Sequence, residues 1–217
     1  MVWVELVAAV LSAIAVWLST IRSLWCQPIG LVSVILYAWV FVSARLYSDV
    51  LLQFLNVIML VYGWLYWRQH LGDDRRVTVA ALAPRLATFH VVLGILGALV
   101  LGYAMRHWTN AALPWLDATL TSFSMVAAWW QDRRHIAAWW LWIPVNTVYV
   151  GEFLYKDLAI TSALYAGFVL LSIIGLRGWQ RAGKEQAMPG PQPPAPDATV
   201  VAPPPAHATD ALGKAAK

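Results

Sequence analysis

The sequence predicts an all-α membrane protein with seven transmembrane helices. Hydrophobic residues make up 60% of the 217 residues and charged residues 12%, whereas soluble domains are about half apolar and a quarter charged. The apolar residues gather into runs close to the roughly 20 residues that a helix needs to cross a bilayer. Backbone in lipid must satisfy its own hydrogen bonds, and these runs are too long for barrel strands, so we expect helices.

The expected spans follow one another with short breaks, except for a longer loop from Arg68 to Arg85. Their approximate limits are Trp3–Ile21, Pro28–Ala44, Val50–Trp67, Leu86–Ala104, Pro114–Trp130, Ala137–Tyr155 and Leu158–Leu176. The first ten residues, MVWVELVAAV, contain no basic residue, so we interpret them as the start of the first span rather than a signal peptide. After Arg181 the chain becomes rich in Pro and Ala. We therefore expect a membrane domain over residues 1–181 and a disordered tail over residues 182–217.

Lys and Arg near the span ends predict the orientation. One side holds Arg22, Arg68, Arg75, Arg76, Arg85, Arg133, Arg134, Arg177, Arg181 and Lys184, and the other holds Arg45, Arg106 and Lys156. The positive-inside rule then places the amino terminus outside and the carboxyl terminus in the cytoplasm. We interpret the net charge of +4 in the same way, as a marker of topology, and not as a sign of nucleic-acid binding.

A sequence pattern recurs in the two ends of the chain. LYSD at residues 46–49 is followed by GWLYW at 63–67, and LYKD at 154–157 is followed by GLRGW at 175–179. The pattern predicts two three-helix repeats, spans one to three and spans five to seven. Because three is an odd number, a fourth span is needed between them to give both repeats the same orientation. Such repeats commonly hold their substrate at the interface between them.

The sixth span carries the stretch WWLWIPVN, in which tryptophans and an asparagine stand inside an apolar run. At 100° per residue, one arc about 80° wide contains Trp139, Trp142, Asn146, Tyr149 and Phe153. Polar residues inside spans usually face the bundle interior. The spacing therefore predicts an aromatic wall with an amide set into it.

Three other spans present amide or hydroxyl side chains on shared faces, with Gln53 and Asn56 on the third, Thr121 on the fifth and Tyr37 on the second. We expect Trp139, Trp142, Asn146 and Gln53 to form the main substrate site, with Asn56, Tyr37, Thr121 and Tyr149 added to it. Two alternatives stay open. Hydroxyl residues at helix interfaces also serve packing, and tryptophans near span ends form the interfacial belt.

Several classes of function lack their motifs. The chain has a single cysteine and no Cys/His spacing for a metal. It has no phosphate-binding loop, no HExxH and no GxSxG. We therefore expect neither an enzyme nor a cofactor. No carboxylate stands at the middle of a span, so the sequence does not support ion coupling, although backbone carbonyls can also bind Na⁺.

The motifs above are similar to those of the PnuC family of bacterial vitamin transporters, relatives of the SWEET sugar transporters, over roughly residues 22 to 180. The resemblance rests on LYSDVLLQFLNVIMLVYGWLYW (46–67), DATLTSFSMVAAWW (117–130), WWLWIPVN (139–146) and LYKDLAITSALY (154–165). It implies seven helices in two repeats, often assembled as a homotrimer. It also implies uptake of nicotinamide riboside across the bacterial inner membrane by facilitated diffusion, with trapping by a cytoplasmic riboside kinase that leads to pyridine nucleotides.

Nicotinamide riboside, the substrate that the resemblance implies, suits the expected site, because its pyridinium cation is attracted to an indole face. Many family members carry a Glu-Asn pair before the first tryptophan, where this chain has Ala137-Ala138. The resemblance therefore leaves open a related vitamin such as thiamine, and the residues themselves leave open a membrane-embedded enzyme that uses Asp49, Asp117 and Asp157.

Overall fold

The apolar runs of the sequence are helical in a computed structural model of the chain, which describes residues 2–43, 47–109, 113–155, 157 and 159–188. In this part of the chain there are seven helices: α1 (Val2–Thr20), α2 (Cys26–Ser43), α3 (Tyr47–Arg68), α4 (Pro84–Trp108), α5 (Pro114–Asp132), α6 (Ala137–Tyr155) and α7 (Ala159–Ala187). Proline stands at the start of α4 and α5, where its missing N–H would have no partner in the helix. The predicted disordered tail began at residue 182, and this boundary is wrong, because residues 182–187 belong to α7 and Ala182 is buried in the packing of that helix. The rest of the predicted tail, from residue 189 on, lies outside the described residues, as do Arg45 and Lys156, which entered the orientation argument.

Helix α7 extends past the expected end of its span at Leu176, to Ala187. These added turns pack against the rest of the protein. Trp179 and Ala182 on them are buried, and the side chain of Gln186 accepts a hydrogen bond of 3.1 Å from the backbone N–H of Val79. Packing against the loop between α3 and α4 therefore carries the helix beyond its apolar run.

Three of the described helices are long and apolar enough, by length and composition alone, to cross a membrane: the segments Trp3–Thr20, Pro84–Trp108 and Thr161–Ala187. A shorter apolar segment covers Cys26–Val40 in α2. Large apolar side chains are exposed along α4, among them Phe89, Val92, Leu96 and Val100. Exposed apolar surface on this scale is typical of contact with a membrane or a partner.

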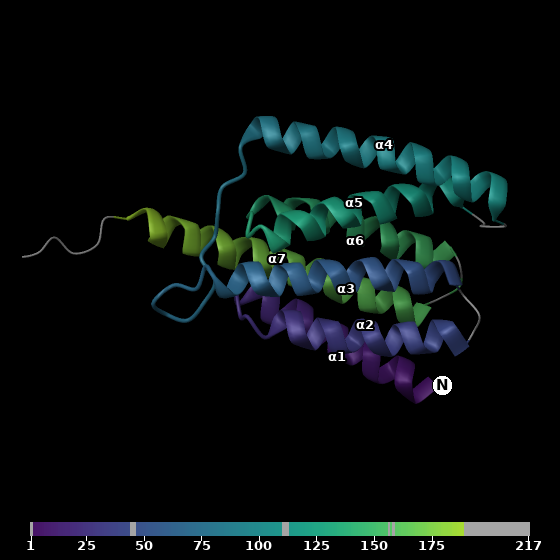
Figure 1. Ribbon diagram of the computed structural model, residues 1–217, viewed down its shortest axis with the longest axis horizontal. Helices are drawn as coiled ribbons and strands as arrows, with labels where there is room; N and C mark the ends of the chain where they lie inside the picture. Colours follow the sequence, from purple (N-terminus) through teal and green to yellow (C-terminus); the bar gives the residue numbers. More distant parts are fainter. Residues whose placement is uncertain (1, 44–46, 110–112, 156, 158, 189–217) are drawn as a thin grey trace, which may run out of the picture. The chain divides into compact units, whose positions relative to one another are not determined.

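Six of the helices form a closed ring. Neighbours in chain order pack together within α1–α3 and within α5–α7, and the ring is closed by α3 against α5 and by α7 against α1. Helix α4 lies at the edge of the bundle (Figure 1) and, within the described residues, packs against α5 alone. The interior of the ring is therefore lined by helices from both ends of the chain.

The turns after α1 and α5 have the same construction. Arg22 has a φ of 59° and Arg134 a φ of 65°, the left-handed conformation that commonly ends a helix. In the first turn the N–H of Arg22 donates to Ser19 (3.1 Å) and that of Ser23 to Leu18 (3.0 Å). The second turn repeats this pattern, with the N–H of Arg134 donating to Gln131 and that of His135 to Trp130, both at 2.8 Å.

Both of these arginines also hold the loop between α3 and α4. Nη1 of Arg22 donates to the carbonyl of Val77 at 3.1 Å, and Nη1 of Arg134 donates to the carbonyl of the next residue, Thr78, also at 3.1 Å. Two cations from opposite sides of the ring thus hold one short segment of backbone. The loop between α3 and α4 is therefore held in place from both halves of the ring.

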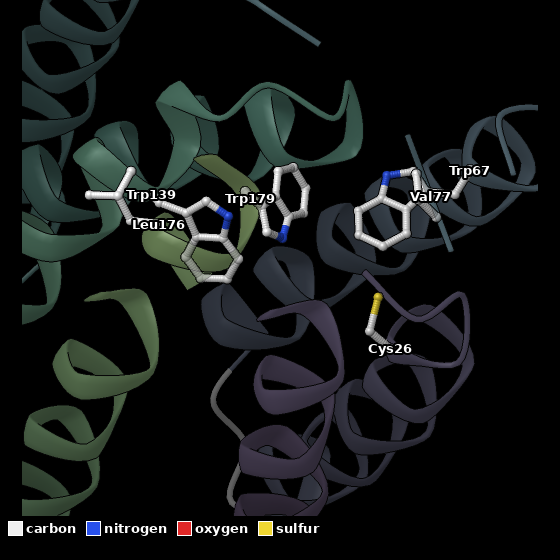
Figure 2. Close-up of a cluster of buried hydrophobic side chains, with 6 residues drawn as sticks. All are labelled: Cys26, Trp67, Val77, Trp139, Leu176 and Trp179. Atoms are coloured by element: carbon white, nitrogen blue, oxygen red, sulfur yellow. The ribbon is translucent and has the colours of Figure 1, made fainter. Parts of the chain in front are cut away.

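A tryptophan cluster forms the core at this end of the ring (Figure 2). It consists of Cys26, Trp67, Val77, Trp139, Leu176 and Trp179. The indole N–H of Trp67 donates to the carbonyl of Asp132, and that of Trp179 to the carbonyl of Ser19, both at 3.0 Å. Each half of the ring thus sends one indole to the last turn of a helix in the other half, and buried indoles keep a hydrogen-bond partner.

Candidate functional site

A cavity of about 390 Å³ lies inside the ring. Helices α1, α3, α5, α6 and α7 line it through Ser12, Val16, Asn56, Thr121, Ser124, Met125, Ala128, Gln131, Trp139, Trp142, Asn146, Tyr149, Tyr165, Phe168 and Ser172. We call it the aromatic cavity. Six of the eight residues that the sequence placed in the site line it: Asn56, Thr121, Trp139, Trp142, Asn146 and Tyr149.

Helix α6 supplies the wall that the spacing predicted. Trp139, Trp142, Asn146 and Tyr149 all line the cavity, whereas Trp140 is 62% exposed on the outer face of the same helix. The separation follows from helical geometry, since positions three and four apart share a face and adjacent positions do not. Trp140 therefore belongs to the outer surface of the helix.

Trp139 is packed more tightly than a simple wall residue. Its side chain is 1% exposed, and its ring meets that of Trp179 edge-on with centroids 5.6 Å apart. The close approach depends on Gly175, because a Cβ at that position would come within 2.7 Å of the indole of Trp139. Figure 2 shows Trp139 directed at Trp179 within the core cluster. Trp139 thus joins the cavity wall to the core.

Trp142 is held at the centre of the site by an amide. Its indole N–H donates to Oε1 of Gln131 at 2.6 Å, and Nε2 of Gln131 donates to Oγ of Ser19 at 2.7 Å. Gln131 stands on α5 and Ser19 on α1, so this chain of two hydrogen bonds crosses the ring. It fixes the plane of the Trp142 ring.

Asn146 has a structural partner as well as a place in the wall. It is buried, at 6% exposure, and its Nδ2 donates to Oγ of Ser172 on α7 at 3.2 Å. Ser172 in turn donates to the carbonyl of Phe168 at 2.7 Å. The side-chain oxygen of Asn146 makes no hydrogen bond within the described residues, so the amide keeps an acceptor for a ligand.

Aromatic rings close one end of the cavity. The ring centroid of Tyr149 lies 4.7 Å from that of Tyr165 and 5.8 Å from that of Phe153, and Tyr165 meets Phe168 edge-on at 5.4 Å. Rings at these separations attract each other in tilted and offset arrangements. They form a rigid apolar surface beside Thr121 and Ser124.

Two of the predicted site residues stand apart from the cavity. Gln53 and Tyr37 do not line it in the part of the chain that the structure describes. Gln53 accepts a hydrogen bond of 3.2 Å from Nδ2 of Asn56, so it contacts a lining residue from behind. Tyr37 is half-buried on α2, and no residue of that helix whose side chain the structure describes lines the aromatic cavity. The face shared by Gln53 and Asn56 is about 60° wide, and only one edge of it meets the interior.

The sequence interpretation missed Gln131 and the residues of α7. Asp117, Thr121, Ser124 and Ala128 share a helix face, and at 100° per residue Gln131 continues that face one turn further, about 40° from Asp117. Ending the span at Trp130 concealed this signal. On α7, Tyr165, Phe168 and Ser172 lie on one face by the same rule, and that face was not assessed.

A second cavity of about 240 Å³ adjoins the first. The two share Ser12, Val16, Asn56, Ala128, Gln131 and Trp142. The second cavity is otherwise lined by Ala15, Ser19, Cys26, Gln27, Gly30, Val34, Met59, Leu60 and Asp132. We call it the aspartate cavity, because Asp132 is the single ionisable acid among these residues.

The polar groups of the aromatic cavity are amides and hydroxyls. Among the described residues that line it, none is Asp, Glu, Lys, Arg or His. Aromatic faces with a few convergent amides and hydroxyls are typical of a small-molecule site. The arrangement fits a ligand with a flat ring and several hydrogen-bonding groups.

A helical bundle with an enclosed aromatic and amide cavity and an apolar outer surface defines the class: a membrane transporter of small molecules. Comparison with known proteins supports this and names the family. The chain belongs to the nicotinamide mononucleotide transporter family, which matches residues 2–181. It is a bacterial membrane protein of that family.

Individual relatives agree with this assignment. The chain is 22% identical over 209 residues to the nicotinamide riboside transporter PnuC of Escherichia coli K12, with 85% of this chain and 87% of that protein covered. It is 24% identical over 194 residues to the riboflavin/roseoflavin transporter RibM of Streptomyces davaonensis, covering 87% and 89%. A crystal structure of the vitamin B3 transporter PnuC superposes with a TM-score of 0.70 at 28% identity, covering 84% of this chain and 83% of that one.

Proposed function

We propose that this protein carries nicotinamide riboside across the bacterial inner membrane by facilitated diffusion. The observation that carries the proposal is the aromatic cavity, in which Trp142 and Trp139 stand beside the amides of Asn146 and Asn56. The pyridinium ring of nicotinamide riboside is a flat cation, and indole faces attract such cations by about 0.5–2 kcal/mol. Its carboxamide and ribose hydroxyls need the hydrogen-bonding groups that the amides offer.

The proposed site consists of the six predicted residues that line the cavity, together with Gln131. Trp142 faces the ring of the substrate, and Gln131 holds Trp142 in place through the bond of 2.6 Å. Asn146 and Asn56 bond the polar groups. Gln53 acts behind Asn56, which it contacts, and Tyr37 plays no direct part. A ligand without hydrogen-bonding groups is disfavoured, because it would leave these amides unpaired.

We propose further that the ring consists of two three-helix repeats, α1–α3 and α5–α7, joined by α4. The order of contacts around the ring is the same in both halves, and the matching turns at Arg22 and Arg134 support the relation. All seven helices then cross the membrane, with the amino terminus outside and the carboxyl terminus in the cytoplasm. Transport follows from rocking of one repeat against the other.

Two further parts of the proposal rest on the family resemblance: assembly as a homotrimer and trapping of the substrate by a cytoplasmic riboside kinase. A disordered tail beyond α7 rests on the Pro-rich and Ala-rich composition of that segment. No described residue in the lining of the aromatic cavity is Asp, Glu, Lys, Arg or His, and this supports uptake without ion coupling. Phosphorylation inside the cell then keeps the internal concentration of free substrate low and uptake continuing.

A second candidate substrate is a related vitamin. The relative named a riboflavin transporter is as similar to this chain as the relative named a nicotinamide riboside transporter. Riboflavin and thiamine both carry flat rings that suit the same wall, and thiamine is also a cation. These three vitamins are therefore the ones to compare.

Uptake into proteoliposomes tests the proposal. Purified protein is reconstituted, and radiolabelled nicotinamide riboside, riboflavin or thiamine is added outside with no ion gradient. We expect nicotinamide riboside alone to enter quickly and to stop when the inside and outside concentrations are equal. Equilibration of thiamine or riboflavin instead would replace the substrate, and a requirement for a proton or sodium gradient would overturn facilitated diffusion.

A further inference from the structure

The aspartate cavity holds a carboxylate that the proposed site does not use. Asp132 ends α5 and is 6% exposed, yet it lines the cavity of about 240 Å³. Its side chain accepts a hydrogen bond of 3.1 Å from Nε2 of Gln27. An amide and a carboxylate therefore stand together in the wall of a partly open cavity.

No cation within the described residues neutralises Asp132. The guanidinium of its neighbour Arg133 lies over three aromatic rings instead, 4.8 Å from the centroid of Trp129 and 5.1 Å from that of Tyr66. Arg22 is directed to Val77 and to Asp74 in the loop. Asp132 is thus a buried acid with one neutral partner.

A buried carboxylate without a cation is costly, because burial removes its hydration and nothing replaces it. A small cation that enters the cavity offsets the lost hydration of the carboxylate, because the two charges attract each other strongly in a low-dielectric site. An anion would be repelled by Asp132, and a neutral ligand would leave the charge unchanged. The carboxylate therefore favours a cation, and the apolar side chains of Val34, Met59 and Leu60 in the same lining favour an organic one.

The two cavities adjoin along a shared wall. Trp142 and Gln131 line both of them, and they are tied together by the hydrogen bond from Trp142 to Gln131 and held by that from Gln131 to Ser19. Asp132 follows Gln131 directly in the chain. A rotation of the Gln131 side chain, with loss of these two bonds, opens one space to the other.

We propose that the aspartate cavity is a second station for the cationic ring of the substrate, with Asp132 as its counter-charge. The inference rests on the proposed function, since it needs a cationic substrate that passes through the helical bundle. In the proposed orientation Asp132 stands toward the cytoplasm. The cationic ring of the substrate leaves the aromatic wall, passes Gln131 and pairs with the carboxylate of Asp132 before it is released.

The variant Asp132→Asn tests the station. Asparagine has the same shape and can still accept the hydrogen bond from Gln27, and Trp67 bonds the backbone carbonyl of residue 132, which is unchanged. Uptake is measured for nicotinamide riboside and for its 1,4-dihydro form, whose ring is uncharged. We expect the initial rate of the cation to fall about tenfold, since an ion pair of limited exposure is lost, and that of the neutral form to change less than about twofold.

Asp73→Asn is the matched control, because it removes a carboxylate from an exposed position in the loop before α4. It should leave both rates unchanged. If Asp132→Asn lowers the two rates equally, or lowers neither, the station is wrong while the proposed function stands. If the wild type itself fails to equilibrate nicotinamide riboside, the proposed function fails.

Cys26 provides a second readout, because it is the chain's single cysteine and it lines the same cavity. The rate of its alkylation by N-ethylmaleimide is followed in proteoliposomes. Saturating nicotinamide riboside should slow the labelling at least about threefold in the wild type and not in Asp132→Asn. The same labelling rate with and without the substrate in the wild type would show that the substrate does not enter this cavity.

Discussion

The two halves of the ring place different side chains at matching positions. The same interval in the sequence separates Arg22 from Arg134, Trp67 from Trp179, and Gly63 from Gly175. At that interval, Gln27, Gly30 and Val34 of α2 correspond to Trp139, Trp142 and Asn146 of α6. Of these two sets of side chains, the one from α6 in the carboxyl-terminal half (α5–α7) belongs to an aromatic wall, whereas Gln27 and Gly30 of α2 line the aspartate cavity.

The two glycines make the contrast concrete. A Cβ at Gly63 would collide with the carboxylate of Asp132 and the amide of Gln27, whereas a Cβ at Gly175 would collide with the indole of Trp139. Each half needs a glycine at this point of its third helix, and each uses the space for a different group. The comparison teaches that one scaffold supports a polar cavity on one side and an aromatic cavity on the other.

The largest effect should follow from removal of the aromatic wall. Trp142→Ala should lower the uptake of nicotinamide riboside about 30-fold to 100-fold, because a wall worth about 2–3 kcal/mol is lost. Trp140→Ala, on the exposed face of the same helix, serves as the control and should keep most of the activity. Similar losses in both variants would mean that α6 needs its tryptophans for membrane insertion and not for the substrate.

A somewhat smaller effect is expected for Gly175→Ala, measured as stability in detergent. The added methyl group must displace the packed ring of Trp139, and overpacking of this kind costs about 1–3 kcal/mol. Gly167→Ala on the same helix has open space around its Cβ position and should leave the melting temperature almost unchanged. Equal melting temperatures for the two variants would contradict the close packing of Trp139 against Gly175.

Asn146 should show a binding role beyond its bridge to α7. Asn146→Ala should weaken the apparent affinity for nicotinamide riboside about tenfold, because a substrate group loses its hydrogen-bond partner in a buried site. Ser172→Ala removes the partner of the bridge and one hydroxyl of the cavity lining but leaves the Asn146 amide in place, so its loss of affinity should stay under about threefold. If the two variants lose equal affinity, the bridge accounts for all of the effect of Asn146.

The smallest effects belong to the two residues outside the cavity lining. Tyr37→Phe and Gln53→Ala should each change the uptake rate by less than about threefold, as substitutions away from a site usually do. Direct binding of the substrate to either residue would instead give losses as large as those of Asn146→Ala. Transport assays with all three variants side by side decide between these readings.

The site was predictable from the sequence where one helix carries it. The face of α6 follows from its own periodicity, so Trp139, Trp142, Asn146 and Tyr149 were found without knowledge of any neighbour. Gln131 and Asp132 were not found, because they stand at the end of α5 and their importance comes from packing against α1 and α2. The tight contact of Trp139 with Gly175 likewise depends on how α7 crosses α6, which no local pattern encodes.

The seam between α1 and α7 also has a consequence for how the chain is made. Trp179 donates its indole N–H to Ser19 across 160 positions of sequence, and this contact closes the ring. Contacts between residues so distant in the chain form late in folding. Helices α1–α3 are therefore synthesised long before the partner that seals them, and the last helix to leave the ribosome is the one that turns a row of helices into an enclosed bundle.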